Sequence, residues 1–270
     1  MIDILHFTFM QNALMASLIV SLICGVIGTL IVINRMVFIA GGIAHGSYGG
    51  IGLALYFGIA PMLGASLFAL FLGLIIATIT HKNSTRLDSL IGVLWAFGMA
   101  LGIIMSDLTP GYNVDLMSYL FGAILSVSYV DMLGMGGVLA LVLLFSVVFY
   151  KQLLAMSFDA QFAKLRGVNV TVLYFALVAL IALSVVIIIR AVGLILVIAL
   201  LSIPPYIAEK LTNSMGAMMA VASLLSAVFC FLGLGISYAY DVSSGASIIL
   251  VATSSFLLQF LAGMVLAKKP

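Results

Sequence analysis

The chain has 270 residues, of which 65% are apolar and only 7% charged, and its formal net charge is +2. Soluble domains carry roughly 25% charged residues, so this composition excludes a surface that mostly faces water. The ten basic residues form no cluster, which argues against a nucleic-acid-binding protein.

Stretches without charged residues recur along the chain and predict its elements. Runs of at least 18 residues lack Asp, Glu, Lys and Arg, and each can cross a hydrocarbon core about 30 Å thick. Membrane strands would be shorter and would alternate polar with apolar residues. We therefore expect an all-α integral membrane protein, with the whole chain 1–270 forming a single bundle of about nine transmembrane helices (eight to ten). The expected spans are 12–33, 37–58, 61–80, 88–106, 131–150, 171–190, 192–209, 214–236 and 244–266.

The second span carries His45, the one ionisable side chain expected deep in the bilayer. It lies about nine residues, or roughly 13 Å, from the start of that span. The spacing of Gly42, Gly46 and Gly50 predicts the close approach of another helix. A neutral imidazole is a ligand for zinc and is usable by manganese and iron, and a structural hydrogen bond between helices is an equally good interpretation. His45, with the nearby Ser47 and Tyr48, is our candidate lining of a metal path.

The first long connection, 107–130, contains the stretch 116–127, which is too short to span and is expected to form a re-entrant or interfacial helix. Acidic residues gather on the side of the membrane that holds this connection. They are Asp3, Asp107, Asp115, Asp131 and Asp241. We expect Asp107 and Asp115 to form an outer mouth that attracts cations, although acids are also simply tolerated on that side.

The second long connection, 151–170, contains an amphipathic pattern. Phe158, Phe162 and Leu165 recur at helical spacing, with Asp159, Lys164 and Arg166 between them. Gly167 is placed as a helix stop. Such a helix must bury its apolar stripe, either on the lipid interface or in a cytoplasmic partner.

Two features lie near the ends of later spans. Pro204 and Pro205 predict a kink or a break in the seventh span. With Glu209 they form a candidate inner gate or hinge. The alternative is an ordinary interfacial charge pair at the end of a helix.

Asp241 at the outer end of the eighth span is expected to cap the following helix or to belong to a cation entry site.

The basic residues predict the orientation of the chain. If the C-terminus is cytoplasmic and the N-terminus is outside, nine of the ten lie on the cytoplasmic side, as the positive-inside rule requires. These nine are Arg35, Lys82, Arg86, Lys151, Lys164, Arg166, Lys210, Lys268 and Lys269. Arg190 is the exception.

Motifs for energy conversion and catalysis are missing from the sequence. There is no phosphate-binding loop, and no metalloprotease or hydrolase motif. The interiors of the spans are nearly free of the ionisable residues that mark ion-coupled carriers. We therefore expect a transport subunit that is not itself an enzyme and that a separate motor drives.

Five segments in the same order resemble the zinc/manganese/iron ABC permease family (ABC-3 type). The segments are 35–45, 120–128, 158–168, 192–204 and 237–249. Many members carry an Asp four residues before the histidine, where this chain has Gly41.

The resemblance implies a fold like that of cobalamin and siderophore permeases, in the cytoplasmic (inner) membrane of a prokaryote. It implies import of Zn²⁺, Mn²⁺ or Fe²⁺ by alternating access, with no permanently bound cofactor. The partners it implies are a second copy of the chain, two ABC ATPase subunits docked on segment 158–167 and an extracytoplasmic metal-binding protein. The rival functions are an importer of metal chelates and an ion-coupled carrier that works alone.

Overall fold

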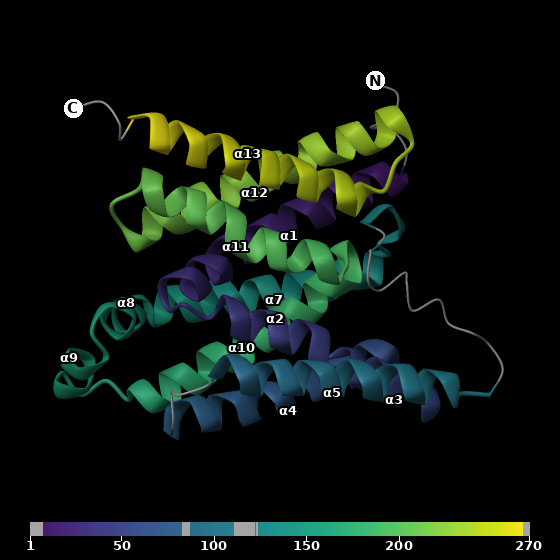
Figure 1. The fold of residues 1–270 in the computed structure, drawn as a ribbon, viewed down its shortest axis with the longest axis horizontal. Helices are drawn as coiled ribbons and strands as arrows, with labels where there is room; N and C mark the ends of the chain where they lie inside the picture. Colours follow the sequence, from purple (N-terminus) through teal and green to yellow (C-terminus); the bar gives the residue numbers. More distant parts are fainter. Residues whose placement is uncertain (1–7, 83–86, 111–121, 123, 267–270) are drawn as a thin grey trace.

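The computed structural model describes residues 8–82, 87–110, 122 and 124–266. Within these residues nine helices are long and apolar enough to cross a membrane, and they lie side by side in one bundle (Figure 1). The spanning elements are α1 (Thr8–Ile33), α2 with α3 (Val37–Gly46 and Tyr48–Tyr56), α4 (Pro61–Lys82), α5 (Leu87–Asp107), α7 (Tyr129–Val148), α10 (Val170–Val192), α11 (Leu194–Leu211), α12 (Met215–Tyr240) and α13 (Ser244–Leu266). The short elements are η2 (Ile124–Ser126), α8 (Tyr150–Phe158) and α9 (Ala160–Leu165). The expected all-α membrane bundle is confirmed.

The centre of the bundle is formed by α1 and α10, which carry long runs of buried residues. α1 packs on α11, α12 and α7, and α10 packs on α4. By contrast, α5, α7 and α13 leave many large apolar side chains exposed, among them Val93, Leu144 and Leu258. Exposed apolar side chains of this number are stable against lipid tails rather than water.

The second span differs from its prediction as one continuous helix. It is interrupted for one residue at Ser47, between α2 and α3. The Ser47 hydroxyl donates to the Ala44 carbonyl at 2.7 Å, a local bond of the kind that bends helices. The interruption lies close to His45, in the middle of the span.

Glycines hold this broken span against its neighbours. A Cβ added at Gly98 of α5 would fall on the backbone of Gly46, and one at Gly102 would fall on the backbone of Tyr48. On the other side Gly50 meets the backbone of Gly64 in α4. These contacts fix the position of α2 and α3 along α5, because only glycine allows backbones to approach so closely.

The two ends of the bundle differ in charge. α9 lies at the end where α13 finishes (Figure 1), and basic residues that belong to this end lie in or beside helix termini there. They are Arg35, Lys82, Lys151, Lys164, Arg166 and Lys210. Arg190, in the last turn of α10, lies at the opposite end. Arg86, Lys268 and Lys269 lie outside the described residues.

Candidate translocation path and coupling surface

His45 is held by two contacts in the middle of the second span. Its Nδ1 is 2.9 Å from the Gly41 carbonyl oxygen, and its ring stacks on Trp95 of α5 with centroids 3.8 Å apart and an angle of 27°. A carbonyl can only accept, so Nδ1 carries the proton and donates in this contact. Nε2 therefore presents a lone pair, and a carbonyl bonded to the other ring nitrogen is the usual support of a metal-binding histidine.

The face of α2 that carries His45 also carries Gly41 and Phe38. A Cβ at Gly41 would meet only Ile198 Cδ1, at 3.8 Å, so the position that holds an Asp in many family members has room for a side chain. Phe38 lies two turns before His45 and lines a groove of about 860 Å³ between the end of α1, the start of α2, α11 and α13. Its lining includes Arg35 and Glu209, which lie toward the α9 end of the bundle.

The lining of the groove also includes residues near the predicted gate. Ile203, Tyr206 and Glu209 line it, and Lys210 Nζ lies 5.6 Å from the centre of the Tyr206 ring. Pro204 and Pro205 are buried inside α11, which runs through them without interruption. The predicted break of the helix is thus wrong. Pro205 packs where Gly28 of α1 leaves space, so tight packing holds the helix together at this point.

Ser47 and Tyr48 do not share the environment of His45. Ser47 is buried and lines a small cavity beside α4 and α10, together with Met62 and Val186. Tyr48 is buried against Gly102 of α5. Only His45 of these three candidates reaches the Trp95 side of the span.

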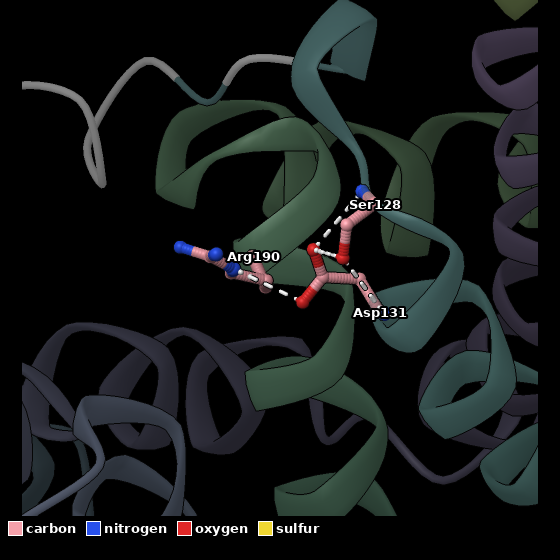
Figure 2. Close-up of polar contacts among 3 residues, drawn as sticks. All are labelled: Ser128, Asp131 and Arg190. Carbon is pink, nitrogen blue, oxygen red and sulfur yellow. Dashed lines mark hydrogen bonds and ion pairs between the residues drawn. The ribbon is translucent and has the colours of Figure 1, made fainter. Parts of the chain in front are cut away.

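Arg190, the one basic residue expected on the outer side, pairs with one of the predicted outer acids. Its Nε lies 3.3 Å from Asp131 Oδ1, and Figure 2 shows the two side chains meeting between α10 and α7. Asp131 Oδ2 accepts from the Ser128 amide at 3.1 Å, and Ser128 Oγ accepts from the Asp131 amide at 3.2 Å. This capping box starts α7. The carboxylate therefore serves the helix start and the pair with Arg190.

The other predicted outer acids are not gathered into a metal site. Asp107 ends α5 and is exposed, and Asp115 lies outside the described residues, as does most of the stretch 116–127. Asp241 adopts a left-handed conformation with φ of 53° and ends α12. Its predicted roles, as cap of the following helix or in a cation entry site, stay predictions. Among the described residues, no three His, Cys, Asp or Glu side chains could hold one ion together.

The coupling segment, 151–170, contains two helices: α9 lies within the range 158–167 predicted to be helical, and α8 precedes it. Phe158 ends α8, and Asp159 starts α9 by accepting from the amides of Gln161 and Phe162 at 3.0 and 2.9 Å. Gly167 follows α9 with φ of 78°, so the predicted stop is confirmed. The break arises because an aspartate that accepts amide protons ends one helix and starts another.

The apolar side chains of this segment are nevertheless unpacked. Phe158 is 74% exposed, Phe162 is 48% exposed and Leu165 is 87% exposed, while Arg166 lies over the Phe162 ring at 5.1 Å. A cluster of this kind at a water-facing end of a membrane protein favours a protein partner. We call Phe158, Phe162 and Leu165 the coupling cluster.

Polar contacts connect the coupling cluster to the groove. Asn34, after α1, donates from Nδ2 to Ser157 Oγ at 2.9 Å and to the Leu30 carbonyl at 2.8 Å. A second cavity of about 420 Å³, lined in part by Phe158, shares Arg35 and Glu209 with the groove. Asn34 and Trp95 were not among the predicted site residues, although Trp95 is the single tryptophan of the chain.

The nine described spans define the class of the protein, a polytopic α-helical membrane protein. The family model described as ABC 3 transport family matches residues 6–263. The chain belongs to this family.

Similar proteins agree with this assignment. The membrane protein slr2045 of Synechocystis is 52% identical over 96% of this chain and 92% of its own length. The manganese transport system membrane protein MntC of Halalkalibacterium halodurans is 35% identical over 96% of this chain and 88% of its own length. ScaB of Streptococcus gordonii, named a manganese import system permease protein, is 35% identical over 94% of this chain and 91% of its own length.

Solved structures share the arrangement of helices. The structure of PsaBC from Streptococcus pneumoniae in complex with Fab matches with a TM-score of 0.86 and 36% identity, over 96% of this chain and 94% of that one. An inward-facing metal-chelate type ABC transporter matches with a TM-score of 0.71 and 17% identity, over 93% of this chain and 85% of that one. The second match shows the fold alone.

Proposed function

We propose that this chain is the membrane-spanning subunit of an ATP-driven importer of divalent metal ions, with Mn²⁺ as the first cargo to test. The observation that carries the proposal is the contact of His45 Nδ1 with the Gly41 carbonyl in the middle of a span. This contact leaves Nε2 as the nitrogen that can accept a metal ion. Relatives named as manganese transport proteins support the choice of metal.

The chemistry of the site favours transient binding. One imidazole without a neighbouring carboxylate leaves most coordination positions of the ion to water, which suits Mn²⁺ better than a tight nitrogen site would. An ion that must pass needs a site weak enough to leave. Zn²⁺ and Fe²⁺ share the affinity for imidazole and are the competing cargoes.

The exposed coupling cluster and the membership of the ABC 3 transport family support the proposed partners. Two ABC ATPase subunits would dock on the coupling clusters of two copies of this chain, and an extracytoplasmic metal-binding protein would bind at the end that holds Asp131. The path would run between the two copies, along the face with the groove and His45. ATP-driven closure at α9 would then alternate access to the path through Asn34 and the residues shared by the two cavities.

Charge supports an orientation in which the α9 end is cytoplasmic. The basic residues listed above lie at this end, and Arg190 at the opposite end is paired with Asp131. Pairing neutralises the one basic side chain that the positive-inside rule disfavours on the outside. The membrane would be the cytoplasmic membrane of a prokaryote, with the N-terminus outside.

Replacing His45 tests the proposed function. We expect His45→Ala to lower the uptake of radioactive Mn²⁺ by the reconstituted transporter at least about tenfold, because the ion loses its only side-chain ligand in the middle of the span. Thr78→Ala is the matched control, since Thr78 is exposed on α4 and bonds only to Leu74 of its own helix. Equal uptake by His45→Ala and the wild type would remove His45 from the path.

A further inference from the structure

Trp95 covers one face of the His45 ring. We propose that it is a positioning residue of the metal path, which holds the imidazole in the orientation that offers Nε2 to a passing divalent cation. The inference rests on the proposed function of His45. It adds Trp95 as a residue that supports the imidazole without contacting the ion. It accounts for how one histidine can serve without the carboxylate that position 41 lacks.

The stack is set by the backbone and not by the two rings alone. Trp95 lies three residues before Gly98 on α5, and His45 directly precedes Gly46 on α2. Because Gly98 and Gly46 meet backbone to backbone, the two helices cannot slide or separate without loss of this contact. The indole is thus kept at 3.8 Å from the imidazole, whatever occupies the path.

Two further contacts hold the indole of Trp95 in place. Its Nε1 donates to Met99 Sδ at 3.0 Å, one turn further along α5, and its ring lies 6.5 Å from that of Phe38. One side of the His45 ring therefore faces an aromatic wall formed by Trp95 and Phe38. The Gly41 carbonyl holds Nδ1 on a second side, so Nε2 is the remaining polar atom of the ring.

Binding of a cation strengthens the same contact. A metal ion at Nε2 withdraws electrons from the imidazole, and an electron-poor ring is attracted to the electron-rich face of an indole. Trp95 thus favours the metal-bound state of His45 through the stack. An aliphatic side chain at position 95 would fill space but would give neither the orientation nor this attraction.

Two substitutions separate stacking from packing. In the complete transporter, we expect Trp95→Leu to raise the KM for Mn²⁺ about tenfold, the loss typical for a group that orients a metal ligand. The maximal uptake rate should fall by a smaller factor than the KM rises. Trp95→Phe should keep a KM near the wild-type value, although it also loses the bond to Met99. An unchanged KM in Trp95→Leu, or an equal rise in both variants, would overturn the inference.

Tryptophan fluorescence tests the stack of Trp95 on His45 without a substitution at Trp95. Because the chain has a single tryptophan, its emission in proteoliposomes of the full chain reports on the stack. Paramagnetic Mn²⁺ should quench this emission in a saturable way in the wild type, and the saturable part should vanish in His45→Ala. Saturable quenching that persists in His45→Ala contradicts the proposal, even if Trp95→Leu fails to fold.

The two levels of the proposal fail in different ways. If the wild-type transporter moves no divalent metal, the proposed function is wrong. If uptake depends on His45 while the KM is insensitive to Trp95→Leu and Mn²⁺ does not quench the tryptophan, only the role of Trp95 is wrong.

Discussion

Leu165→Asp is expected to abolish ATP-driven uptake while the membrane bundle stays folded. Leu165 is 87% exposed on the six-residue helix α9, so it supports no core. A charge in the centre of a docking surface must be desolvated on binding, and such positions cost about 2 kcal/mol or more, roughly 30-fold in affinity. Copurification of the ATPase with the permease, together with Mn²⁺ uptake, measures the effect.

The control for this variant introduces the same charge at the opposite end of the bundle. Val130 is 75% exposed near the start of α7, so Val130→Asp should leave ATPase binding intact. If Leu165→Asp binds the ATPase as well as Val130→Asp does, α9 is not the docking helix.

Gly98→Ala is expected to destabilise the protein, whereas Gly92→Ala on the same helix is not. A Cβ at position 98 would overlap the backbone of Gly46, while one at position 92 meets nothing within 4 Å. Overpacking of this kind costs about 1–3 kcal/mol, and alanine in place of glycine otherwise favours a helix by up to about 1 kcal/mol. The two variants should therefore shift the thermal unfolding midpoint of the solubilised protein in opposite directions.

Gly98→Ala and Gly92→Ala also test how close packing of α5 on α2 places Trp95. Gly98→Ala should also change the emission of Trp95, because the added methyl group pushes α5 away from α2. Equal midpoints and equal emission for Gly98→Ala and Gly92→Ala would show that close backbone contact is not what places the two helices.

The number and order of the spans could be predicted because charged residues are excluded from hydrocarbon. The ends of the helices could not. α1 already includes Thr8, before the predicted start at residue 12, and α12 continues to Tyr240 rather than to residue 236. Helices extend into the interface, where tyrosine and hydroxyl side chains are stable, so hydropathy marks the bilayer and not the last helical turn.

The candidate site was only partly predictable. His45 stands out in a sequence poor in charge. Its stack on Trp95, however, depends on the contact between Gly46 and Gly98, which are far apart in the sequence. No periodicity in either helix fixes that register. The division of the coupling segment has a local cause in Asp159, which can be part of a helix or start one. The intact helix at Pro204 and Pro205 depends on contacts with α1 that local sequence does not contain.

The central claim is that this bundle moves metal only when another protein supplies the work. The direct measurement is uptake of radioactive Mn²⁺ into proteoliposomes that contain the permease with or without its ATPase, in the presence and absence of ATP. We expect uptake above background only when permease, ATPase and ATP are all present. Uptake by the permease alone, at a rate that ATP does not change, would contradict the account and identify a carrier that works by itself.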